Sequence, residues 1–153
     1  MIPLALAFHT MAAIIWVGGM VFTLWFLRPA LAAAPKPTAL GIWRAVLGRF
    51  FTAVWASIAV LLGTGYGVVF FGYDGFAAVG IHVHIMQATG LTMVALFALM
   101  WAKPWQDFRR AVAAGQPEAA AKAMKQIRLV VMINMPLGLF TAAIGATGGF
   151  WAY

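Results

Sequence analysis

Three histidines are the residues of this chain best suited to metal chemistry. His9 lies in the first apolar run, and His82 and His84 lie two positions apart in the stretch GIHVHIMQ. Imidazole is a common axial ligand of haem iron, and ionisable side chains in membrane helices usually have a function. The chain has no cysteine, which excludes disulfides, thiolate metal sites and iron–sulfur clusters.

Composition indicates an integral membrane protein with a single domain, residues 1–153. The 153 residues are 65% hydrophobic and only 8% charged, whereas a soluble chain has roughly 25% charged residues. The net charge of +7 does not indicate a nucleic-acid partner, because the basic residues flank apolar runs. The first run has no preceding basic residue and is too long for a cleaved signal, so we expect a retained span.

Four apolar runs have the length of about 20 residues that crosses a bilayer. Their continuous apolar character predicts helices and argues against a β-barrel, whose strands alternate. We therefore expect an all-α fold, a transmembrane antiparallel four-helix bundle in the lipid bilayer. The predicted spans are 3–27, 50–71, 79–101 and 129–151.

The charges predict the orientation of this bundle. All ten basic residues lie in the first and third connections, whereas the short second connection carries only Asp74. The positive-inside rule places both basic connections in the cytoplasm and both termini on the periplasmic side of a bacterial inner membrane. The first connection contains AAAPKP, which should break a helix, and the third contains an alanine-rich helix after Pro117.

The histidines are predicted to lie at one level in the outer third of the membrane. At about 1.5 Å per residue, His9 is about 9 Å deep, and His82 and His84 are about 5–8 Å deep. Residues two apart on a helix point about 200° away from each other, so His82 and His84 should not share a face. Small and polar residues mark interior faces. The predicted interior stripes are Ala5, His9, Ala12, Trp16, Gly19 and Thr23 in the first run, Thr52, Ala56, Ala59, Gly63 and Tyr66 or Gly67 in the second, Gly80, His84, Gln87 and Leu91 in the third, and Asn134, Gly138, Thr141, Gly145 and Gly148 in the fourth. On this basis His9 and His84 should face each other across the bundle.

Glycines at the same level suggest what lies between these two histidines. Gly63, Gly67 and Gly145 would allow a flat group to approach the helices closely, although glycine-rich faces also serve simple helix packing. The pattern predicts haem b with His9 and His84 as axial ligands and these glycines as walls. Two roles remain open for His82. It could face the membrane interface, or it could form a hydrogen bond to a haem propionate.

Copper is the alternative cofactor. Thioethers suit Cu(I), and the chain has nine methionines. His82 and Met86 are spaced i, i+4 and could chelate one ion, whereas the H-x-M tripeptides at His9 and His84 diverge on a regular helix. A copper site would draw on His9, His82, His84 and Met86.

Segments in all four runs resemble the copper-resistance D (CopD) family of bacterial inner-membrane proteins. The resemblance rests on FHTMAAIIWVGGMVFTLWFLRPAL, RFFTAVWASIAVLLGTGYG, HVHIMQATGLTMVALF and IRLVVMINMPLGLFTAAIG. It implies a link to copper uptake or homeostasis, in a family whose copper role often belongs to larger members.

The layout is also similar to that of HemJ-type protoporphyrinogen oxidases, which implies haem b. His9, Trp16, Gly19 and the Arg28–Pro29 pair follow that pattern. Where those proteins have H-x-K and an asparagine–glutamate pair, this chain has His82-x-His84 and Asn134–Met135. These departures argue against porphyrinogen oxidation and leave haem binding open.

The sequence thus predicts a haem b-binding redox or electron-transfer protein of the inner membrane. Its expected partners are a quinone or a periplasmic redox or copper protein. The sequence leaves open whether the chain is an oxidoreductase or a carrier, and whether it forms a homodimer. The alternative is a copper uptake or copper-resistance protein.

Overall fold

The computed structural model describes residues 1–151, and these residues form helices and turns without any strand. Residues 152–153 of the predicted domain lie outside the described part. The α-helices are α1 (Ile2–Phe22), α2 (Arg28–Ala32), α3 (Lys36–Gly72), α4 (Ile81–Ala102), α5 (Pro104–Ala113) and α6 (Pro117–Thr147). A π-helical turn, η1 (Thr23–Leu27), joins α1 to α2, and the short 3₁₀ turns are η2 (Phe76–Ala78) and η3 (Gly148–Phe150).

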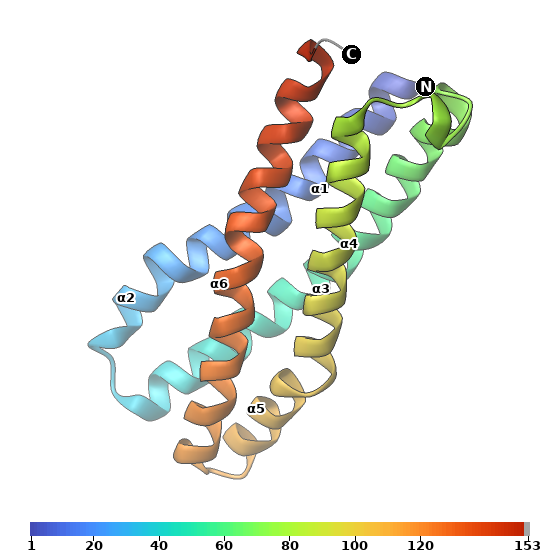
Figure 1. The fold of residues 1–153 in the computed structure, drawn as a ribbon. Coiled ribbons are helices and arrows are strands. Elements are labelled where there is room, and N and C mark those ends of the chain that lie inside the picture. The colour runs from blue at the N-terminus through green and yellow to red at the C-terminus, as the bar shows by residue number, and fades with distance from the viewer. Residues whose placement is uncertain (152–153) are drawn as a thin grey trace.

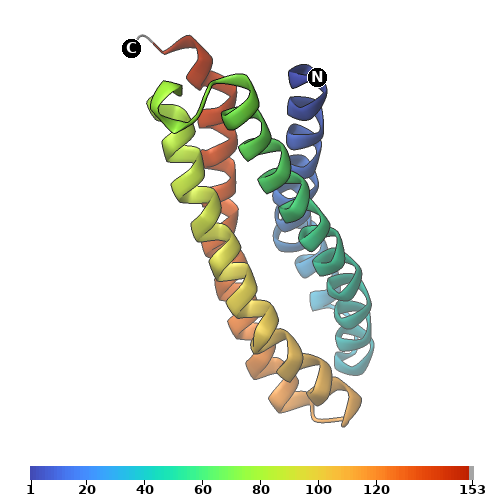
Figure 2. The same ribbon diagram turned by 90° about the vertical axis from the view of Figure 1, so that its right-hand side faces the viewer.

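Four helical segments are long and apolar enough to cross a membrane, which indicates a multi-pass membrane protein. These segments are Ile2–Ala32, Lys36–Gly72, Ile81–Ala113 and Pro117–Phe150. The predicted all-α class and the existence of four long apolar helices are therefore confirmed. The helices run side by side along one common direction (Figures 1 and 2).

Two of these helices begin earlier than predicted. α3 starts at Lys36 and α6 at Pro117, instead of near residues 50 and 129. Both helices open with proline in their first turn, where the missing N–H costs nothing. Since no further proline follows before the apolar run, each helix continues into it without interruption. The break predicted at AAAPKP is confirmed, because α2 ends at Ala32 and α3 starts at Lys36.

The bundle consists of two helix pairs. α1 packs along α3, and α4 packs along α6, with α5 covering the start of α6. The start of α1 and the end of α6 lie at one end of the molecule, and both basic connections lie at the other (Figure 1). We call these the terminal end and the basic end.

The core of large side chains lies in the half of the bundle near the basic end. Its aromatic members meet edge to face: Phe51 with Phe97 at 5.5 Å between ring centroids, and Phe51 with Trp105 at 5.0 Å. Phe51, Phe97 and Phe108 are almost completely buried. In lipid such packing acts mainly through dispersion contacts, because the surrounding acyl chains are as apolar as the core.

The turn between α3 and α4 needs a glycine at one position. Gly75 has φ +104°, a conformation open to glycine but strained for other residues, and Asp74 before it has φ +58°. This turn reverses the chain at the terminal end and brings α4 back beside the other helices.

Candidate cofactor site

His9 projects from α1 toward α3. Its Nδ1 lies 2.9 Å from Thr64 Oγ1, and its Cε1 would lie only 3.2 Å from a Cβ placed on Gly65. The absence of a side chain at Gly65 is therefore what lets the imidazole lie against α3. The predicted interior face of α1 is confirmed by the burial of Ala12, Trp16 and Thr23.

The hydrogen bonds of Thr64 define the state of His9. Thr64 Oγ1 lies 2.6 Å from the Val60 carbonyl oxygen, and a carbonyl can only accept. The hydroxyl proton is thus donated to Val60, and the same oxygen must accept from His9 Nδ1–H. In a neutral His9 with its proton on Nδ1, the lone pair is on Nε2. A metal-binding histidine usually has its second nitrogen fixed in this way.

His82 and His84 lie in different surroundings, as their spacing predicts. His82 packs against Gly148, where an added Cβ would overlap its ring, and its ring centroid lies 6.2 Å from that of Trp151. His84 is exposed, and its ring centroid lies 6.0 Å from that of Phe76. Within residues 1–151, the His84 ring makes no hydrogen bond.

The face of α4 that was predicted to be interior is buried only in part, since Gly80 and Gln87 are half-buried and Gln87 bonds to Tyr66 of α3. We expected His84 and Leu91 on the interior face, but both are exposed. Met86 lies against Gly145 and Met93 against Gly138 of α6, and His82 lies against Gly148 in the turn η3 that follows α6. The stripe that contains His82 therefore forms this helix–helix contact, and His84 lies on another side of α4.

The three glycines predicted as walls of the cofactor site, Gly63, Gly67 and Gly145, lie in different surroundings. A Cβ on Gly145 would lie 2.9 Å from Met86 Cε, so the methionine already covers this glycine. A Cβ on Gly63 or Gly67 would have nothing within 4 Å. Gly63 belongs to an exposed stripe with Thr52, Ala56 and Ala59, which corrects the predicted interior face of α3. The buried face of α3 is instead formed by Leu47, Phe51, Val54, Ser57, Ile58, Val68 and Val69.

The half of the bundle around the histidines is held together by polar contacts instead of a large apolar core. Gln87 Nε2 donates to Tyr66 Oη at 3.3 Å, which links α4 to α3. Thr141 Oγ1 and Thr89 Oγ1 lie 2.7 Å apart and link α6 to α4. The buried side chains in this half are small. Ala12, Val68 and Val69 are examples.

Within residues 1–151, no three histidine or carboxylate side chains come together in a group that could hold a metal ion. The three histidines thus do not form one copper site in this structure. No known protein family, curated protein or solved structure matches the chain. The geometry of the residues is consequently the basis for any functional assignment.

Thr64 is the site residue that sequence reasoning missed. Counting about 1.5 Å per residue from the predicted end of its helix near residue 71 places Thr64 about 10 Å deep, close to the level of His9. The matching depth of the Thr64 hydroxyl and the His9 ring could therefore have predicted their contact.

Proposed function

We propose that this protein binds haem b and transfers electrons in a membrane, with His9 and His84 as the axial ligands. The observation that carries the proposal is the contact of His9 Nδ1 with Thr64 Oγ1 at 2.9 Å, which favours the tautomer whose Nε2 lone pair could bind iron. His84 is the second ligand because its ring is accessible and unrestrained by hydrogen bonds. His82 is engaged against α6.

The residues present fit this group. His9 belongs to the α1–α3 pair and His84 to the α4–α6 pair, so a shared group would lie between the two pairs. The side chains buried at that level are small, and Tyr66 and Gln87 supply polar atoms nearby. Haem supplies one-electron redox chemistry, and the protein ligates, orients and encloses it. The exposed Gly63 and the covered Gly145 are not needed as walls.

The proposal includes an orientation and partners. The basic end faces the cytoplasm by the positive-inside rule, so the histidines lie near the periplasmic surface of a bacterial inner membrane. An electron partner would be a membrane quinone or a periplasmic redox protein.

Haem titration of purified variants tests this assignment. We expect wild-type protein to bind one haem and to give the split α and β bands of a low-spin iron after reduction. His9→Ala and His84→Ala should each weaken binding at least about tenfold, because each removes a ligand. His82→Ala is the matched control and should retain the spectrum. Equal haem binding by all variants would contradict the proposal.

A copper site is the second candidate, and one observation favours it. His82 and Met86 both lie on the α6-facing side of α4, against Gly148 and Gly145. An imidazole and a thioether so placed suit Cu(I). If copper is the ligand, His82→Ala and Met86→Leu should both lower Cu(I) retention while His84→Ala does not. Unchanged retention in the first two variants would remove this candidate.

A further inference from the structure

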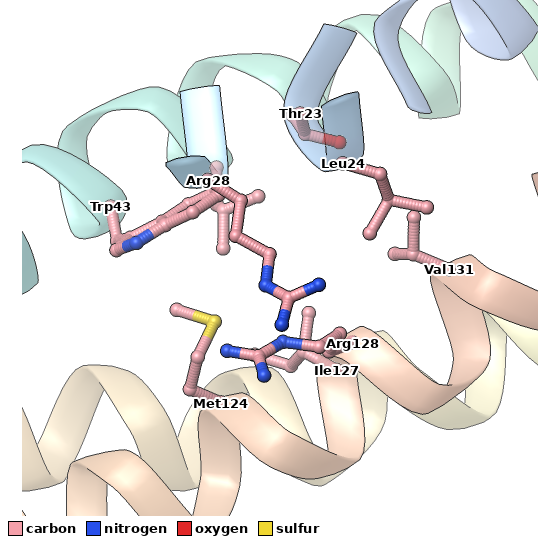
Figure 3. Close-up of a pocket in the computed structure, with 9 residues that line it drawn as sticks. Thr23, Leu24, Arg28, Trp43, Met124, Ile127, Arg128 and Val131 are labelled. Atoms are coloured by element: carbon pink, nitrogen blue, oxygen red, sulfur yellow. The ribbon is translucent and has the colours of Figure 1, made fainter. Parts of the chain in front are cut away.

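Two arginines converge at the basic end without an acidic partner. Arg28 from α2 and Arg128 from α6 line one pocket, and their guanidinium groups lie side by side in its centre (Figure 3). Two positive charges placed so close together repel each other. Such a pair is unfavourable unless an anion compensates it.

The chain contains no carboxylate side chain that could fill this role. Its three acidic residues are Asp74, Asp107 and Glu118. Asp74 lies in the turn at the terminal end, and Asp107 pairs with Lys103 and Arg110 at 3.2 Å. Glu118 lies ten residues before Arg128 on α6, about 15 Å away along the helix. No acidic side chain of the chain therefore neutralises this pair, which leaves it open to an external anion.

The local backbone is built to present Arg28 to this pocket. The π turn η1 ends directly before it, and the Arg28 backbone N–H bonds to the Thr23 carbonyl. The wider turn changes the direction in which the following residues point relative to a regular helix. Such turns are costly and are found frequently at functional sites.

The remaining lining indicates the class of anion. Apolar side chains surround the two guanidinium groups, among them Leu24, Ile127 and Val131, and Trp43 lies at the edge. Tryptophan is typical of the headgroup level of a membrane. The pocket also lies where the apolar spans give way to the basic connections. Arginine pairs bind phosphate groups through several parallel charge-assisted hydrogen bonds.

We propose that Arg28 and Arg128 together bind the phosphate of an anionic phospholipid, with its acyl chains against the apolar lining. This site is separate from the proposed haem site, since Arg28 follows His9 by 19 residues, about 28 Å along the helix. It is therefore testable whether or not the protein binds haem.

Thermal unfolding of the delipidated full chain in neutral detergent tests the proposal. Phosphatidylglycerol should raise the Tm of the wild type by about 4 °C or more, because a ligand of the folded state stabilises it. Phosphatidylcholine, which carries no net charge, should have a much smaller effect. Arg28→Gln and Arg128→Gln should each lose most of the gain. Arg44→Gln is the matched control, since Arg44 is exposed and does not line this pocket.

The Tm without lipid separates ligand binding from a purely structural role. Removing one of two repelling charges should leave the lipid-free Tm of Arg28→Gln equal to or above that of the wild type. Native mass spectrometry should show at least about tenfold less retained phosphatidylglycerol in this variant. An equal lipid gain in all variants would overturn the proposal. A gain reproduced fully by inorganic phosphate would overturn the lipid as its source.

Discussion

In the proposed haem site the hydroxyl of Thr64 holds His9 by its Nδ1, and this role can be tested directly. Thr64→Val keeps the shape of the side chain but removes the acceptor 2.9 Å from His9 Nδ1. We expect haem affinity to fall about 10- to 100-fold, as is typical when the partner of a metal-binding histidine is lost. The measurement is a haem titration followed in the Soret band.

Thr52→Val is the control for this experiment. Thr52 lies on the same helix, is exposed, and donates only to the Gly48 carbonyl within that helix. Its replacement should leave haem affinity unchanged. If Thr64→Val also binds haem like the wild type, Thr64 does not orient His9.

Neighbouring glycines in α1 should respond differently to the same substitution. A Cβ on Gly19 would overlap the ring of Phe50, whereas a Cβ on Gly18 would meet nothing within 4 Å. Gly19→Ala should thus destabilise the fold by about 1–3 kcal/mol through overpacking. Gly18→Ala should be neutral or slightly stabilising. Unfolding in detergent measures both, and equal stability of the two variants would show that Phe50 adjusts at no cost.

At the level of elements, the sequence predicted the four apolar helices but not which face of each is buried. α3 carries two stripes of small residues, one with Gly63 and Ala59 and one with Gly65 and Gly72. The sequence alone does not determine which of the two stripes packs against a neighbouring helix. The structure places Gly65 and Gly72 against α1, where His9 and Ile2 contact them. The histidine level follows from helical rise, whereas the side on which His84 lies depends on tertiary packing.

The turn between α3 and α4 should depend on glycine at position 75. Gly75→Ala should lower the stability of the fold by about 1–3 kcal/mol, because φ +104° is strained for alanine. Gly90→Ala is the comparison, since Gly90 lies within α4 and an added Cβ there meets nothing within 4 Å. Thermal unfolding of both variants gives the difference. A loss at Gly90 as large as at Gly75 would contradict the assigned role of the turn.

For the whole molecule, the absence of cysteine makes the topology directly measurable. Ala77 lies at the terminal end and Ala114 at the basic end, and both are exposed. With the basic end in the cytoplasm, Ala77→Cys should react in intact cells with a maleimide that enters the periplasm but not the cytoplasm. Ala114→Cys should react only after the inner membrane is permeabilised, and the unmodified chain should not react. The reverse labelling pattern would invert the proposed orientation.

Several features of the whole molecule support one functional proposal. A core of large side chains fills the basic half, whereas polar pairs and small buried residues surround the histidines in the other half. The most direct test is the visible spectrum of the wild-type protein, purified in detergent after expression with haem available, before and after reduction. We predict a sharp Soret band and split α and β bands in the reduced state. A colourless protein that remains colourless when haem is added would contradict the haem assignment.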